Sequence, residues 1–228
     1  MATHTDVLAA LDAETDALLD ALARITPTEY RRATRCAPWD VAALAVHTVG
    51  ALDRVVAVLE AAPPPPGART GAAGYYRPDV RFSAEVDADR VESAMAAAER
   101  ADPALIAAAG ARLRARLRPL LRAAPGDRMV RTRHGDAMTL TDFLVTRVLE
   151  ILVHGLDLAD ALGRRPWATG PGVELVGGLF AETADRSALE GTGLTGLAFV
   201  RAATGRALPG QAGRSALAGT GVRDLALG

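Results

Sequence analysis

Lysine is absent from this sequence of 228 residues, and all 26 of its basic residues are arginine. This absence excludes a catalytic lysine, a Schiff base and the lysine of a phosphate-binding loop. There is one cysteine, Cys36, so an intramolecular disulfide is impossible, and a zinc ribbon or zinc finger is excluded. The chemistry of the chain must then come from its carboxylates, its arginines and its four histidines.

Excess charge and long apolar runs are missing as well. A formal net charge of −1 gives no electrostatic reason to expect binding to nucleic acid or to an anionic membrane. No uninterrupted apolar run reaches the ~18 residues of a membrane helix. The N-terminus has no basic segment leading into an apolar core, as a secretory signal would. We therefore expect a cytoplasmic protein that binds neither nucleic acid nor a membrane.

Helical periodicity dominates the chain, and half of the residues are hydrophobic, enough for one sizeable core. Strand patterns are scarce, so the fold class that we predict is all-α, with a possible small α+β element. Residues 1–165 are expected to form an up-down four-helix bundle, and residues 166–228 a small C-terminal segment that packs on it. The helices are predicted at about residues 4–24, 40–61, 85–123 with a break near Asp102–Pro103, and 139–163.

Turn signals separate these helices. The run PPPPG at residues 63–67 opens an irregular stretch to about residue 84, long enough to suggest the lid or rim of a cavity. Residues 125–138 carry two turn signals and predict a short hairpin. Residues 166–172 are expected to be a linker. The tail beyond them is rich in glycine, with one clearer helical segment at residues 193–206.

The stretch VTRVLEILVHGLDLADALG, residues 145–163, is apolar around most of a helical wheel but carries a narrow polar line. Arg147, Glu150, His154 and Asp157 fall on that line. Spacing of i and i+4 places Glu150 and His154 on one face, close enough to bind the same ion. Buried Glu and His are costly unless they are paired or bound to a metal. A solvated edge that carries an ordinary Glu–His pair is the alternative.

His47 is the candidate for a third ligand. It lies in WDVAALAVHTVGALDRVV, where Ala43, Gly50 and Ala51 flank it on its own face. A glycine within a helix costs about 1 kcal/mol relative to alanine, so it usually has a packing or space reason. Small residues around an imidazole leave room for another group. His4 and His134 are weaker candidates because they lie near a terminus and in a turn-rich loop.

Two segments, CAPWDVAALAVHTVGALDRV and MTLTDFLVTRVLEILVHGLDLADALG, resemble the DinB-like, mycothiol-dependent maleylpyruvate isomerase family. The shared pattern is a Trp before a helix with a His eight residues on, followed later by R-x-x-E-x-x-x-H-G-x-D-x-A. The resemblance covers residues 1–165 and implies a metal-binding four-helix bundle with His47, Glu150 and His154 as ligands. It also implies mycothiol as cosubstrate, which suits the lysine-free, alanine-rich composition typical of actinobacteria.

The resemblance implies an enzyme that activates a low-molecular-weight thiol on a divalent metal. Two imidazoles and one carboxylate are a familiar catalytic zinc set, so zinc is the metal we expect, while Mn, Fe, Co and Ni stay open by ligand type. A metal-bound thiol is deprotonated and nucleophilic. Its attack on an electrophilic small molecule would give either cis–trans isomerisation or S-transfer.

Three arginines are expected to hold a carboxylated or polar substrate, namely Arg54, Arg147 and Arg201, and Arg206 is a further candidate from the tail. Each could instead be an ordinary surface or helix-capping residue. Asp157 is a candidate for orienting a ligand imidazole.

Two other functions remain open at this point. One is a thiol-independent hydrolase of the same fold that uses metal-bound water. The other is a non-catalytic bundle that binds a metal or a small molecule, favoured by a tail shorter than the isomerase's second domain. We expect a monomer or a homodimer.

Overall fold

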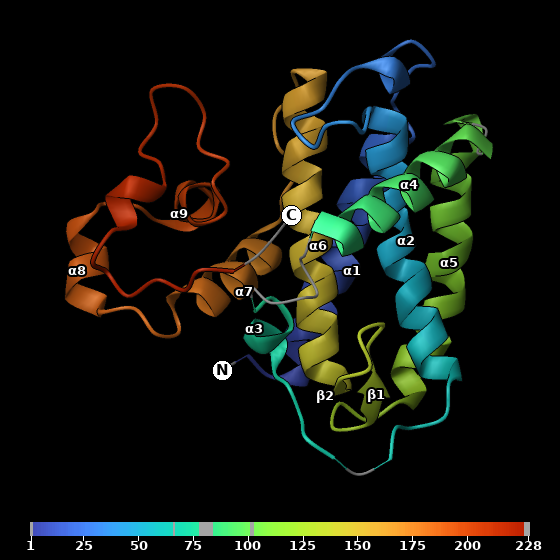
Figure 1. The fold of residues 1–228 in the computed structure, drawn as a ribbon, viewed down its shortest axis with the longest axis horizontal. Helices are drawn as coiled ribbons and strands as arrows, with labels where there is room; N and C mark the ends of the chain where they lie inside the picture. Colours follow the sequence, from blue (N-terminus) through green and yellow to red (C-terminus); the bar gives the residue numbers. More distant parts are fainter. Residues whose placement is uncertain (1, 66, 78–83, 101–102, 226–228) are drawn as a thin grey trace.

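The structure is a computed structural model that describes residues 2–65, 67–77, 84–100 and 103–225. Four long helices pack side by side as a bundle (Figure 1). The predicted bundle is therefore confirmed. Its helices are α1 (His4–Leu22), α2 (Val41–Glu60), α5 (Pro103–Ala123) and α6 (Leu140–Leu162).

The order of directions differs from the simple up-down succession that we predicted, because periodicity carries no information about helix direction. In Figure 1, α1 and α6 run upward while α2 and α5 both run downward. The connection from α2 to α5 therefore travels the length of the bundle. It contains the one-turn helix α3 (Ala72–Tyr75) and the long helix α4 (Ala84–Arg100), which packs against α2. The bundle thus has one long crossover instead of short loops throughout.

Local sequence signals fix the ends of the two helices that matter most for the site. Asp40 caps α2, and its carboxylate accepts a hydrogen bond from the backbone N–H of Ala43. Thr139 caps α6 in the same way through the N–H of Asp142. Gly163 ends α6 in the left-handed conformation with φ of 66°, which favours glycine. These caps place the start of each helix as the sequence predicts.

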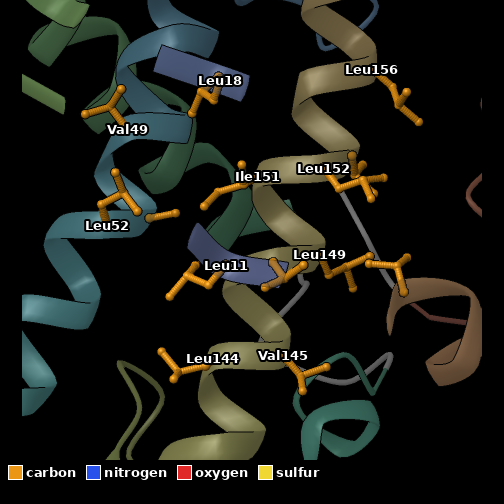
Figure 2. Packing of buried hydrophobic residues seen from close by; sticks show 14 of the residues in the cluster. Leu11, Leu18, Val49, Leu52, Leu144, Val145, Leu149, Ile151, Leu152 and Leu156 are labelled. Carbon is orange, nitrogen blue, oxygen red and sulfur yellow. The ribbon is translucent and has the colours of Figure 1, made fainter. Parts of the chain in front are cut away.

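The core lies where α1, α2 and α6 meet, and leucine, isoleucine and valine side chains from all three helices fill it. Figure 2 shows this packing around Leu11 and Leu18 of α1, Val49 and Leu52 of α2, and Ile151 of α6. On α6, most residues are buried, among them Arg147, His154 and Asp157 of the polar line, while the side chain of Glu150 is 23% exposed. The solvated-edge alternative for its polar line is therefore wrong.

By length and composition alone, α2 could cross a membrane, since its most apolar window has a mean hydropathy of 1.6. More than half of that window, 56%, is buried inside the protein. The helix packs against α4, α5 and α6. Its place at the centre of the bundle therefore explains the apolar composition of α2.

The remaining elements confirm the hairpin and extend the predicted helical content of the tail. β1 (Met129–Arg131) pairs antiparallel with β2 (Ala137–Thr139) in the stretch predicted as a hairpin. The expected linker ends early, since α7 (Gly170–Ala181) already begins at residue 170. It is followed by α8 (Arg186–Gly191), α9 (Gly196–Ala203) and the short 3-10 helix η3 (Arg214–Leu217), and α7 packs on α1 and α6.

Candidate metal centre

Two helices that are distant in the sequence bring the three predicted ligands together. His47 projects from α2, and Glu150 and His154 project from one face of α6. The Oε2 atom of Glu150 lies 3.8 Å from Nε2 of His47 and 3.5 Å from Nε2 of His154. One ligand atom from each residue lies within 4.8 Å of the other two. The three side chains can therefore converge on one point.

The donor set and its spacing fit a divalent metal ion. Ligands about 2.1 Å from a tetrahedral ion are separated from one another by about 3.4 Å, close to the two distances to Glu150. Two imidazole nitrogens and one carboxylate oxygen are donors that zinc and other first-row metals accept. Three protein ligands leave a coordination position for another molecule, which distinguishes a catalytic from a structural site.

Burial and mutual contact shift the pKa values of the three groups in different directions. Burial lowers the pKa of His47 to about 4, so its ring is neutral and free to bind a metal near pH 7. Burial opposes the charged form of Glu150, but hydrogen bonds from His154 and His47 and the charge of Arg147 hold its pKa well below the usual range. Glu150 therefore remains a carboxylate.

His154 differs from His47 in having a second acidic neighbour. Its Nδ1 lies 3.2 Å from Oδ2 of Asp157, whose side chain is completely buried. Burial favours the neutral ring, but hydrogen bonds with Asp157, Cys36 and Glu150 raise the pKa of His154 well above its usual value. A metal would therefore displace a proton from Nε2, while Nδ1 keeps its hydrogen bond to Asp157.

Asp157 is the centre of a small buried network. Arg206, from the tail, contacts both of its oxygens, with Nε 2.8 Å from Oδ1 and Nη2 2.8 Å from Oδ2. The thiol of Cys36 lies 3.4 Å from Oδ2, and the guanidinium of the half-exposed Arg35 lies 3.7 Å from Oδ1. The expected role of Asp157 beside an imidazole thus agrees with where it lies.

The second carboxylate oxygen of Glu150, Oε1, accepts a hydrogen bond from Tyr76. The hydroxyl of Tyr76 lies 3.1 Å from Oε1 of Glu150 and 2.9 Å from the carbonyl oxygen of Thr146. Tyr76 is fully buried beside Tyr75, so the long irregular stretch contributes directly to the site. Tyr75 faces the cavity described next.

The three ligands line a cavity of about 550 Å³ that is rich in arginine. Glu150 is the only carboxylate among the lining residues that the structure describes. A cavity with this balance of charge attracts anionic molecules. Its arginines come from the region before α2, from α2 itself, from the hairpin, from α6 and from the tail: Arg35, Arg54, Arg133, Arg147, Arg206 and Arg214.

The three arginines expected to hold substrate do not all reach this cavity. Arg54 and Arg147 line it, and Arg147 is buried against the rings of Phe143 and Tyr75, with its Nη2 free of any hydrogen-bond partner. Arg201 does not line the cavity. It makes two hydrogen bonds to Asp160 of α6, each 2.8–2.9 Å long, and this pairing indicates a role in attaching the tail.

Several residues of the cavity have no signal in the local sequence. Arg35, Arg133 and Arg214 lie in irregular segments or short elements where no periodicity applies. The ring centres of Trp39 and His47 lie 4.5 Å apart.

Gly50 is not among the lining residues of the cavity, and a Cβ there would meet nothing within 4 Å. The expected space reason for this glycine is therefore wrong. His4 contacts Thr141 and His134 packs on Tyr75, and neither belongs to the group of three ligands.

Two solved structures share the fold. One is the mycothiol-dependent maleylpyruvate isomerase, with a TM-score of 0.59 and 18% identity over 92% of this chain and 92% of that chain. The other is a histidine-to-alanine mutant of the mycothiol-dependent maleylpyruvate isomerase, with a TM-score of 0.52 and 18% identity over 83% of this chain and 73% of that chain. The first likeness reaches beyond residues 1–165 into the tail.

No curated protein sequence matches the chain. A family model does match, over residues 11–159, which include all three candidate ligands and most of the bundle. Its description is "Mycothiol maleylpyruvate isomerase N-terminal domain". The chain therefore belongs to the mycothiol maleylpyruvate isomerase N-terminal domain family.

Proposed function

We propose that this protein is a divalent-metal-dependent enzyme that uses mycothiol, or a similar low-molecular-weight thiol, to isomerise or transfer sulfur to an anionic electrophile. The observation that carries the proposal is one cavity in which the His47, Glu150 and His154 ligand set faces a group of arginines. Membership of the family supports the thiol. The two imidazoles and one carboxylate favour zinc.

Each part of the cavity has a distinct task in this proposal. His47, Glu150 and His154 would hold the cation, which when bound favours the deprotonated form of a thiol sulfur beside it. Arg54 and Arg147 would bind a carboxylate of the electrophile and fix its reactive carbon near that sulfur. Buried rings of Trp39 and Tyr75 would limit the access of water.

The reaction that the residues suit best is reversible addition to a conjugated double bond. The thiolate forms a carbon–sulfur bond, and the electron pair moves toward a carbonyl group of the substrate. Rotation about the resulting single bond and loss of the same sulfur return the thiolate and give the other geometric isomer. If the adduct instead takes a proton on carbon and leaves, the net result is S-transfer.

Purified protein should contain metal in about equimolar amount, and the His47→Ala variant should lose it. Turnover of maleylpyruvate, or of another unsaturated dicarboxylate, should require both metal and mycothiol. Glu190→Gln is a matched control, because Glu190 is an exposed carboxylate on α8, and its variant should retain both. A full rate without thiol would favour the hydrolase alternative, and metal binding with no turnover would favour a non-catalytic bundle.

The proposal also places the protein in the cytoplasm, where a low-molecular-weight thiol is kept reduced. Fractionation of the source cells would test this. We propose a monomer or a homodimer, which light scattering of the purified protein would distinguish.

A further inference from the structure

The tail reaches the metal centre through one buried ion pair. Asp157 has a side chain with 0% exposure, and the Arg206 side chain that pairs with it is 5% exposed. The two are joined by a pair of hydrogen bonds of 2.8 Å each. Such a bidentate contact fixes the plane and rotamer of the carboxylate. The same Oδ2 atom that accepts from Arg206 faces Nδ1 of His154.

Two further hydrogen bonds hold the side chain and the backbone of Arg206 in place. Its Nη1 donates to the carbonyl oxygen of Thr204 at 2.8 Å, and its own carbonyl oxygen accepts from Arg201 at 2.8 Å. Arg201 in turn is paired with Asp160 on α6. The loop after α9 is thereby attached to the last turns of α6, and Arg206 points inward toward Asp157.

From these contacts we infer that Arg206 is a positioning residue for the metal centre and acts on His154 through Asp157. This inference rests on the metal site of the proposed function. A carboxylate on Nδ1 of a ligand histidine holds the ring in the tautomer that presents Nε2 to the metal. Arg206 holds that carboxylate in the plane and rotamer that face Nδ1. The tail, which comes from outside the matched part of the chain, would thus tune a site built on the bundle.

Losing Arg206 has two effects on metal affinity, and they act in opposite directions. Removing a positive charge near a divalent cation should by itself strengthen metal binding. Without Arg206, however, Asp157 would keep only the Cys36 thiol at 3.4 Å and the half-exposed Arg35 guanidinium at 3.7 Å. A buried carboxylate with such weak partners tends to turn away, and this change would release Nδ1 of His154 and weaken the metal site. We expect the second effect to dominate because Asp157 has no exposure to water that could replace the arginine.

The test measures metal affinity by competition with a chelator, without substrate or thiol. Loss of a partner in this position typically weakens metal binding about 10- to 100-fold, and we expect such a loss for Asp157→Asn. Arg206→Gln should lose about tenfold in the same assay. In the double variant, Arg206→Gln should add nothing to Asp157→Asn, because the arginine acts through the aspartate.

Arg214→Gln is the matched control. Arg214 lies in the same tail and lines the same cavity, but it pairs with Asp224 and not with Asp157. Its removal takes away the same charge from the cavity without touching Asp157, so metal affinity should stay the same or rise slightly and should not fall. A second measurement is the visible spectrum of the protein saturated with Co²⁺, which should change in the Asp157 and Arg206 variants and not in the control.

Arg206→Lys covers the case in which the glutamine variant fails to fold. Lysine keeps the charge and one hydrogen bond, so its affinity should lie between those of wild type and Asp157→Asn. Unchanged or tighter metal binding in the folded Arg206 variants would overturn the inference alone. Multiplying effects in the double variant would do the same, whereas failure of the wild-type protein to bind any metal would overturn both this inference and the proposed function.

Discussion

The arginines that line the cavity differ in what compensates their charge. Arg206 is paired with Asp157 and Arg214 with Asp224. Arg147 is 3% exposed, and its Nε donates to the hydroxyl of Thr146, but its Nη2 has no hydrogen-bond partner. A buried donor without a partner is costly, and an anionic group of a ligand would satisfy it. At the residue scale, Arg147 is therefore the most informative position for substrate binding.

Replacement of Arg147 by glutamine should lower kcat/KM for an anionic substrate about 10- to 100-fold, the effect expected for loss of a charged hydrogen bond. Metal content should stay near that of wild type, because Glu150 and both histidines are retained. Steady-state kinetics with a charged substrate and with its methyl ester would check this. An equal loss for the ester would contradict a role in binding the anionic group.

Tyr76 offers a second prediction at this scale. Its hydroxyl is buried between Glu150 and the carbonyl oxygen of Thr146. In Tyr76→Phe, a buried acceptor loses its donor, so we expect the free energy of unfolding to fall by about 1–2 kcal/mol. Urea denaturation of the metal-free protein would measure it. Tyr30→Phe is a useful comparison, because the Tyr30 hydroxyl makes only a long contact of 3.5 Å and should matter less.

The residues of the site differ in how far local sequence spacing could predict them. Glu150 and His154 could be predicted because the i, i+4 spacing on one helix already places them together. His47 could be proposed from the small residues beside it, Ala43 and Ala51, and then from a family pattern, because no local spacing pairs α2 with α6. Arg35 and Arg133 lie in irregular segments, where sequence spacing carries no information about direction. Their place in the cavity depends on packing between distant parts of the chain.

At the scale of elements, capping signals predicted helix ends well and composition predicted the tail poorly. Asp40, Thr139 and Gly163 lie at the predicted ends of α2 and α6. By contrast, α7 is a full helix although its sequence GPGVELVGGLFA contains four glycines. Burial of Val176 and Phe180 outweighs the low helix propensity of glycine, and that burial exists only once the tail has docked on the bundle.

The start of α7 rests on an acidic side chain from α1. Glu14 is 1% exposed and accepts hydrogen bonds from the backbone N–H and the hydroxyl of Thr169, at 2.7 and 2.6 Å. Burial raises the pKa of Glu14, and the two hydrogen bonds from Thr169 only partly oppose that effect. A Cβ on Gly172 would collide with the carboxylate, so the glycine permits this close approach. The contact attaches α7 to the bundle.

The raised pKa of Glu14 in the folded protein determines how its contribution to stability changes with pH. Glu14 binds its proton more tightly in the folded than in the unfolded chain. Its stabilising contribution is therefore complete below its unfolded pKa of about 4.5 and is lost as the pH rises through the higher folded value. Glu14→Gln stays neutral and keeps an acceptor for Thr169. The variant should have a higher urea midpoint than wild type at pH 8, and the difference should shrink at pH 4. A constant difference would contradict ionisation of Glu14 as the cause.

At the scale of the whole molecule, the candidate metal centre joins segments that are far apart in the chain. His47 lies in the second helix of the bundle and Glu150 in the last, and α2 and α6 also pack directly on each other. The unfolded chain does not hold these side chains together, so it binds metal weakly. A ligand that binds the folded state preferentially raises the free energy of unfolding by an amount set by its concentration relative to Kd.

Metal should therefore raise thermal stability by a predictable amount. At a free metal concentration of 100 times Kd, the gain is about 2.7 kcal/mol. For a chain of this size, each kcal/mol moves Tm by about 2–4 °C, so Tm should rise by about 5–10 °C when Zn²⁺ is added to chelator-treated protein. The His47→Ala variant should lose most of this rise, because two ligands on one helix no longer connect α2 to α6. Scanning calorimetry with and without Zn²⁺ would measure both, and an equal rise in the variant would place the bound metal elsewhere than between these two helices.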